Sequence, residues 1–176
     1  ADIGEMAEAD PVEVMSRNVQ KYWRALMDCP KPLIAAVEGF ALGGGLELAL
    51  CADIIIAGEG AKLGLPEVRV GILPGGGGTQ KLARLVGRHR AMLLIMTGKM
   101  FSAAEALGMG VISELAPSGQ ALSRALEVAN DIAAMPAISI MQIKEIVNAG
   151  LNAPLETALM LERKAFQLQF ATRDQK

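Results

Sequence analysis

Residues 33–58 read LIAAVEGFALGGGLELALCADIIIAG, and the class of the fold follows from this stretch. Its two ends, residues 33–37 and 53–57, are short apolar runs of the kind that form buried strands. Between them, the three glycines at 43–45 open a segment whose composition suits a helix. A strand, a helix and a second strand in so short a stretch indicate a βαβ-type crossover with parallel strands. The sequence therefore predicts an α/β fold.

The residues before this stretch predict one long amphipathic helix, from residue 10 to about residue 28. Asp10 can cap its first turn, Pro11 fits the first helical position, and Glu13 stands where a capping box has its carboxylate. We expect Trp23, beside the apolar stripe of this helix, to serve in packing rather than as a platform for a ligand. The stripe recurs at helical spacing and consists of Val12, Met15, Val19, Tyr22 and Leu26.

Turns and helices dominate the rest of the chain. We expect a turn at residues 38–42, a turn-rich segment at 61–78 and a strand at 111–115. Ser102 and Glu105 form a predicted capping box ahead of a short helix that ends at Gly108. The other helices expected after the turn-rich segment cover residues 79–86, 89–97, 119–135, 136–149 and 154–172.

Composition excludes several classes of protein. Of the 176 residues, 52% are hydrophobic and 3% are aromatic, and the formal net charge is −2. This length and hydrophobic content suit one domain with an aliphatic core, not a disordered chain. The balanced charge argues against binding of a nucleic acid backbone, which needs a basic face. The mean hydropathy of +0.34 does not indicate a membrane protein, because Glu38, Glu47 and Asp53 interrupt the apolar run before it reaches the ~18 residues of a spanning helix.

Cysteine and histidine usage argues against a metal centre. Cys29 and Cys51 have neither metal-ligand nor redox-motif spacing, so we expect two buried thiols in a reducing compartment. His89 lies in a basic Gly-Arg-His-Arg stretch and is expected at the surface. With one histidine in the sequence, a His-based metal site cannot form. The sequence predicts no metal site.

The glycine-rich segments allow two interpretations. One is a phosphate cradle at a helix N-terminus. Neither segment fits it, because Leu48 stands where G-x-G-x-x-G needs glycine and Lys81 is out of register for a P-loop. The other is that bare backbone N–H groups face a carbonyl oxygen that becomes negative during a reaction. This second interpretation requires an acid or a base nearby.

Two isolated carboxylates stand in these glycine-rich surroundings. Glu47 lies in an otherwise apolar helix, where it either faces solvent or is held in a dry cleft. Glu67 follows Pro66, a position typical of an exposed residue in the first turn of a helix. Taken alone, each spacing favours a solvated side chain. Because histidine is almost absent, however, this pair is the plausible device for acid–base catalysis.

Residues 34–49, IAAVEGFALGGGLELA, resemble the signature of the enoyl-CoA hydratase/isomerase (crotonase) family. The resemblance continues in order through residues 51–53, 63–67, 71–75 and 77–80, and it covers the whole chain. It implies a crotonase-like spiral core of ββα units followed by a helical C-terminal half. We therefore expect a partial core domain at residues 1–118 and an incomplete helical oligomerisation region at residues 119–176.

The resemblance also implies an activity, the hydration of 2-enoyl-CoA thioesters to 3-hydroxyacyl-CoA. No cofactor is expected, because coenzyme A is part of the substrate. The residues that the resemblance assigns are Glu47 and Glu67 for catalysis, Ala1 and Gly44 for the oxyanion hole, and Asp2, Ile3 and Gly75 for substrate binding.

Two other functions stay open. One is a Δ3–Δ2 enoyl-CoA isomerase or another crotonase-type enzyme, although the presence of both glutamates favours a hydratase. The other is a non-catalytic assembly subunit. The resemblance implies a homotrimer or hexamer. We expect it in the cytoplasm or else the mitochondrial matrix, and the charge and hydropathy described above predict no nucleic acid or membrane partner.

Three features depart from the family pattern. Phe40 stands where tyrosine is frequent, and Leu46 stands where a small residue or cysteine is common. The family's N-terminal strands and C-terminal extension do not match any part of the sequence, so we expect a fragment of a longer chain.

Overall fold

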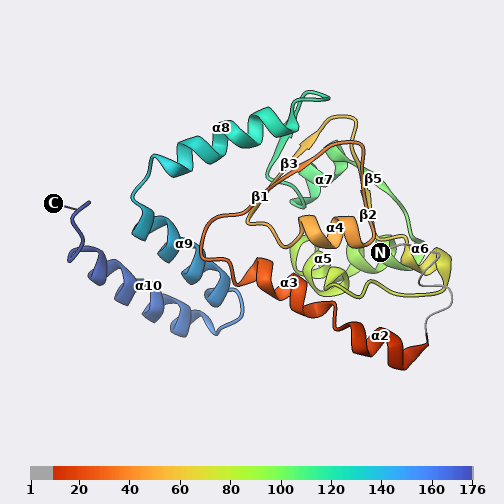
Figure 1. Ribbon diagram of the computed structural model, residues 1–176, viewed down its shortest axis with the longest axis horizontal. Helices are drawn as coiled ribbons and strands as arrows, with labels where there is room; N and C mark the ends of the chain where they lie inside the picture. The colour runs from red at the N-terminus through yellow and green to blue at the C-terminus, as the bar shows by residue number, and fades with distance from the viewer. Residues whose placement is uncertain (1–9, 176) are drawn as a thin grey trace.

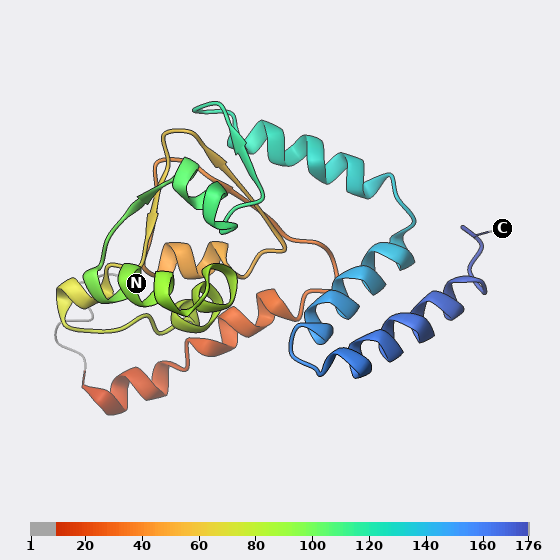
Figure 2. The same ribbon diagram turned by 180° about the vertical axis from the view of Figure 1, so that it is seen from behind.

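The computed structural model describes residues 10–175, and every structural statement below refers to them. Ala1, Asp2 and Ile3, to which the resemblance assigns roles, lie outside the described residues. The described part is a mixed α/β core with a helical arm, in which α9 (Ala137–Gly150) and α10 (Leu155–Gln169) lie side by side at one end of the molecule (Figures 1 and 2).

Two small sheets form the centre of the core. In the first, the order is β1-β3-β6 and both pairings are parallel. In the second, β2 pairs parallel to β4 and β4 pairs antiparallel to β5. The consecutive strands β1 and β2 lie in different sheets, and so do β3 and β4. The chain therefore alternates between the two sheets as it advances, which gives a spiral. The strands are β1 (Ile34–Val37), β2 (Phe40–Leu42), β3 (Ile54–Gly58), β4 (Lys62–Gly64), β5 (Phe101–Ser102) and β6 (Glu114–Ala116).

The helices largely follow the sequence-based expectations. The segment after residue 78 is helical as predicted, and the capping box of Ser102 and Glu105 is present. The elements are α2 (Pro11–Arg17), α3 (Gln20–Met27), α4 (Gly44–Ala49), the 3-10 helix η1 (Glu67–Val70), α5 (Gly78–Val86), α6 (Arg88–Thr97), α7 (Ala103–Met109), α8 (Ala121–Ala133), α9 (Ala137–Gly150) and α10 (Leu155–Gln169).

The prediction of one helix before residue 28 is wrong. The helix breaks between α2 and α3 at Asn18, whose φ of 41° is left-handed. Asparagine adopts this conformation more readily than most residues. At the start of α2, Asp10 Oδ1 accepts the expected hydrogen bond from the Glu13 N–H at 2.8 Å. The Glu13 carboxylate instead pairs with Arg17 at 2.7 Å.

Three strands of the second sheet were not predicted. The expected turn at residues 38–42 contains β2, the turn-rich segment contains β4, and β5 was missed. The strand expected at 111–115 begins later, at Glu114. The parallel pairing of β1 and β3 is confirmed, with Ile34 opposite Ile54 and Val37 opposite Ala57.

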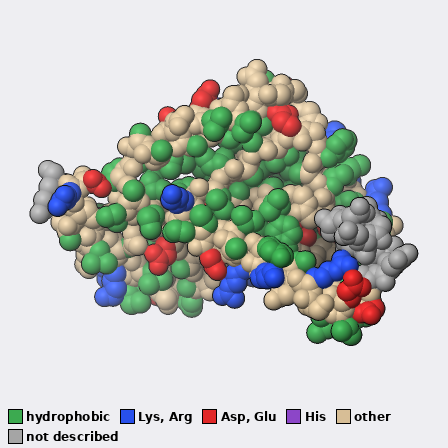
Figure 3. All heavy atoms as spheres, viewed as in Figure 1, with side chains coloured by type: hydrophobic (Ala, Val, Ile, Leu, Met, Phe, Trp, Pro, Cys, Tyr) green, Lys and Arg blue, Asp and Glu red, His purple; other side chains and the backbone are tan. Residues whose placement is uncertain are grey.

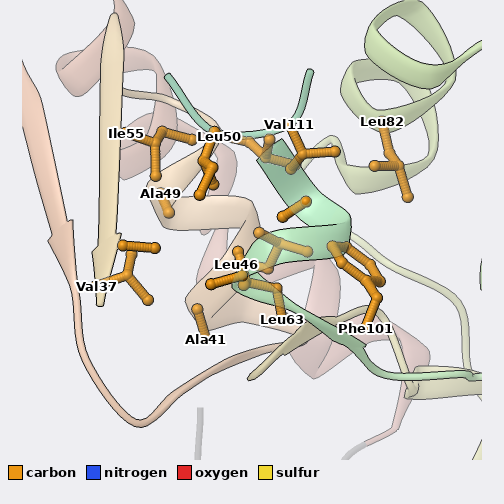
Figure 4. Close-up of a cluster of buried hydrophobic side chains, with 14 of the residues drawn as sticks. Val37, Ala41, Leu46, Ala49, Leu50, Ile55, Leu63, Leu82, Phe101 and Val111 are labelled. Carbon is orange, nitrogen blue, oxygen red and sulfur yellow. The ribbon is translucent and has the colours of Figure 1, made fainter. Parts of the chain in front are cut away.

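An aliphatic core lies between the two sheets and α4. Figure 4 shows side chains from β1, β3, α4, β4, α5 and β5 meeting in one cluster. Leu46, Leu63 and Leu82 are fully buried there. A second, smaller cluster joins β3 to α8 on the opposite face of the first sheet. The structure thus buries α4, and any side chain on its inner face, at the centre of the molecule.

Several smaller expectations can be checked. His89 is exposed, as predicted. Cys51 is buried, but Cys29 is only half-buried, so the expectation for Cys29 is wrong. Among residues 10–175, we find no helix with the length and apolarity needed to cross a membrane.

Candidate active site

Glu47 is a buried carboxylate at the centre of the fold. It lies on α4 and is only 4% exposed, although its spacing alone favoured solvent exposure. Its Oε1 accepts hydrogen bonds from the Gly76 N–H at 2.7 Å and the Gly78 N–H at 2.8 Å. These two bonds offset part of the cost of burying a charged group. They also fix the orientation of the carboxylate, which leaves Oε2 as its oxygen available for chemistry.

Two glycines of the run at residues 75–78, Gly76 and Gly78, are required by this close approach. A Cβ on Gly78 would lie 3.0 Å from Glu47 Oε1 and 2.9 Å from Leu65 Cδ1. A Cβ on Gly76 would lie 2.9 Å from Glu47 Oε2. Any side chain at either position would therefore displace the carboxylate or the backbone. The run is a clamp for a glutamate and not a phosphate cradle.

Trp23 forms part of the same surroundings. A Cβ on Gly76 would lie 2.9 Å from both Cε2 and Nε1 of Trp23. Glu47 Oε2 would lie at the same distance from that Cβ. Sequence reasoning assigned Trp23 to packing without locating it. The signal in the sequence was that Trp23 is its one tryptophan. The structure places the indole of α3 beside the buried carboxylate.

Glu67 begins η1 and is half-buried. Its Oε2 is buried without a hydrogen-bond partner among the described residues. Burial raises the pKa of Glu67 above its usual value, its backbone hydrogen bond opposes the rise, and the charge of Glu47 adds to it. The charge of Glu47 thus acts on Glu67, and the convergence of the two carboxylates on one cleft stays a prediction.

The N-terminus of α4 lies against Glu67. A Cβ on Gly43 would lie 3.2 Å from Glu67 Oε1, and the φ of Gly43 is 54°. Gly43 is held by a 2.9 Å bond from its N–H to the Gly64 oxygen, which continues the β2–β4 pairing. The next residue, Gly44, is exposed and is the first of α4. Its N–H therefore has no intrahelical acceptor and is free to bind an oxygen atom from outside the helix.

These positions bring together the chemistry of a proton-transfer site. Glu47 and Glu67 approach from different elements, and the N–H of Gly44 lies at the N-terminus of the helix that carries Glu47. Gly75 is exposed and directly precedes the clamp. A carboxyl group with a raised pKa is suited to hold a proton that it donates during a reaction. Within residues 10–175, the structure contains no group of three or more His, Cys, Asp or Glu side chains that could hold a metal ion.

Comparisons with known proteins identify the family of the chain. A family model described as "Enoyl-CoA hydratase/isomerase" matches residues 1–176. A probable enoyl-CoA hydratase of Rhizobium meliloti is 46% identical over 100% of the chain, which covers 68% of that protein. A probable mitochondrial enoyl-CoA hydratase of Dictyostelium discoideum is 42% identical over 100% of the chain, which covers 64% of that protein.

A solved structure gives the same result at the level of the fold. The enoyl-CoA hydratase of Bacillus anthracis superposes with a TM-score of 0.94 at 38% identity, over 99% of this chain and 69% of its own. The chain thus spans roughly two thirds of the length of the proteins that it resembles.

Proposed function

The chain belongs to the enoyl-CoA hydratase/isomerase family, and from this premise we propose that it hydrates 2-enoyl-CoA thioesters to 3-hydroxyacyl-CoA. The observation that carries the proposal is the pairing of Glu47 with Glu67 beside the N-terminus of α4. One carboxylate is held by amides, and the other has a raised pKa. Addition of water to a double bond needs one group that accepts a proton and one that donates a proton.

In the proposed mechanism, the thioester oxygen binds to the Gly44 N–H. A second donor comes from Ala1, as the family resemblance implies. As negative charge develops on this oxygen, the N–H donors and the dipole of α4 stabilise it. The loss of one such donor typically costs about 2.7–4 kcal/mol of transition-state stabilisation. Asp2, Ile3 and Gly75 are proposed to contact the rest of the substrate.

The two glutamates then divide the proton transfers. Water lies between them, and Oε2 of Glu47 accepts a proton as the water oxygen bonds to C3. Glu67, whose raised pKa favours the protonated form, donates its proton to C2. The C2=C3 double bond becomes a single bond, and one water molecule has been added. Transfer of the proton from Glu47 to Glu67 restores the starting state. No cofactor takes part in this sequence.

The isomerase alternative makes a different demand on the site. Moving a double bond from C3 to C2 needs one group that shuttles a proton between C2 and C4, and family members with that activity commonly keep one acid. The presence of two carboxylates at one site favours hydration. A non-catalytic assembly subunit has no use for a glutamate buried to 4% exposure and bonded to two amides.

The remaining proposals concern assembly and location. We propose that residues 119–176 form an oligomerisation region next to the core of residues 1–118, giving a homotrimer or hexamer. We propose the cytoplasm as its location, with the mitochondrial matrix as the alternative. One of the relatives described above is bacterial and the other is mitochondrial.

Crotonyl-CoA tests the proposed activity. The full-length protein should consume it with loss of the absorbance of the conjugated thioester, and mass spectrometry should show a product heavier by one water. A 3-enoyl-CoA supplied in parallel separates the alternatives. Conversion of the 3-enoyl-CoA without hydration of crotonyl-CoA would identify an isomerase, and no reaction with either thioester would favour the assembly subunit.

A further inference from the structure

Cys51 is a buried nucleophile that the proposed mechanism does not use. It lies one helical turn after Glu47 and is 8% exposed. Its thiol donates a hydrogen bond to the backbone oxygen of Glu47, with a 3.3 Å distance from Sγ to that oxygen. The sulfur therefore contacts the backbone of a proposed catalytic residue.

Lys81 approaches this sulfur from another helix. It lies on α5, and its Nζ is 2.8 Å from Cys51 Sγ. A lysine on a helix surface usually extends its ammonium group into water. Lys81 is instead half-buried, and among residues 10–175 no carboxylate forms an ion pair with it. The amine nitrogen of Lys81 is thus in direct contact with the thiol of Cys51.

We propose that Cys51 and Lys81 form a modification site in which hydrogen peroxide joins the two side chains through a sulfur–nitrogen bond. The thiolate is the form of cysteine that oxidants attack. Nitrogen is also a known acceptor for an oxidised cysteine, since sulfenic acids condense with backbone nitrogen. Here the lysine amine is already in contact with the sulfur.

The chemistry balances in two steps. The Cys51 thiol and one hydrogen peroxide give the sulfenic acid and one water, so the sulfur loses two electrons and the peroxide gains them. The neutral Lys81 amine, after its ammonium group has lost one proton to water, then attacks the sulfur. The S–N bond forms, the S–O bond breaks, and the hydroxyl leaves with an amine hydrogen as a second water. Two molecules of an added thiol reverse the change by becoming one disulfide.

The expected consequence for activity rests on the proposed function. α4 carries Glu47, and α5 supplies the Gly78 N–H that holds it. An S–N bond is much shorter than the 2.8 Å contact, so it pulls the end of α4 towards α5. Oxidation also removes the thiol hydrogen that bonds to the Glu47 backbone oxygen. Displacement of a catalytic group by about 1 Å can cost ~10²-fold in rate.

Peptide mapping tests the site itself without any measurement of activity. The full-length protein is treated with hydrogen peroxide, digested without reductant and analysed by mass spectrometry. We expect a linked pair of peptides that contains Cys51 and Lys81 and is lighter than the sum of the two by two hydrogens. Dithiothreitol should separate it. Oxidation of Cys51 to acids without any such link would overturn the proposal.

Three variants act as matched controls. Cys51→Ala and Lys81→Met should abolish the link, and Cys29→Ala should leave it intact, because Cys29 has no lysine contact among the hydrogen bonds of the described residues. A link that persists in Lys81→Met would show that another amine captures the sulfur and would contradict the assignment.

Activity measured on the same samples tests the consequence. The treated wild type should lose up to ~10²-fold of its hydration rate and regain it with dithiothreitol, whereas treated Cys51→Ala should keep the rate of its own untreated sample. A link without loss of activity would overturn the regulatory effect but not the modification site. If no preparation hydrates crotonyl-CoA, the proposed function fails while the peptide result still stands.

Discussion

Glu47 and Glu67 are the same residue type in two different surroundings, and their surroundings determine their proposed roles. Glu47 is bonded to two amides, while Glu67 has a buried oxygen without a partner among the described residues. Because Glu67 is the proposed proton donor, Glu67→Gln should lower kcat by about 10²–10⁴ and leave KM nearly unchanged. Crotonyl-CoA kinetics measure both constants. Glu59→Gln, at an exposed glutamate, is the control, and near wild-type kcat in Glu67→Gln would exclude the role.

The raised pKa of Glu67 also predicts a dependence of stability on pH. A carboxyl with a raised pKa in the folded state binds protons more tightly there than in the unfolded chain. Its favourable contribution is present below the unfolded pKa and is lost as pH rises through the folded pKa. Glu67→Gln does not titrate and so does not lose this contribution. The Tm of Glu67→Gln minus the Tm of the wild type should therefore be more positive at pH 7 than at pH 4. A Tm difference that is equal at both pH values would contradict the prediction.

At the scale of elements, the site depends on how closely α5 can approach α4. A Cβ on Gly78 would meet Leu65 and both Oε1 and Cγ of Glu47 within 3.1 Å. Gly78→Ala should therefore move Glu47 and lower kcat by ~10²-fold, with a loss of about 1–3 kcal/mol in stability from overpacking. Gly108→Ala, in a helix with open space around it, should leave kcat unchanged. Equal kinetics in the two variants would show that the clamp is not needed.

The sequence predicted the elements whose residue pattern is local. It did not predict strands or hydrogen bonds whose partners lie far away in the sequence. β1 and β3 are apolar runs on either side of α4, and their parallel pairing follows from the crossover. The second sheet was missed because β2, β4 and β5 have two or three residues each, too few for an alternating pattern. The clamp on Glu47 could not be predicted either, because its donors lie 29 and 31 residues away.

At the scale of the whole molecule, polar contacts from α8 and α9 join the helical C-terminal half to the core. Lys144 of α9, with a side chain only 9% exposed, pairs with Asp53 at 2.7 Å and bonds to the Lys31 backbone oxygen at 2.9 Å. Glu38 accepts a hydrogen bond from the Ala121 N–H at the start of α8 at 2.9 Å. Between these contacts lies an apolar groove of about 490 Å³ lined by β1, α8 and α9, which contains neither glutamate. α8 and α9 are thus anchored to the core at defined points.

The outer surface of the helical arm predicts self-association. Figure 3 shows hydrophobic side chains, with charged ones between them, over the part of the surface where α9 and α10 lie. The exposed fractions are 59% for Ile143, 71% for Leu155 and 63% for Phe166, and a monomer rarely leaves large contiguous apolar patches in water. Light scattering of the full-length protein should therefore report a trimer or hexamer. Ile143→Asp should shift it towards monomer, because a carboxylate buried in the interface has no partner. Glu59→Gln, at an exposed glutamate of the core, serves as the control and should leave the assembly intact. A monomeric wild type would contradict the proposed oligomerisation region.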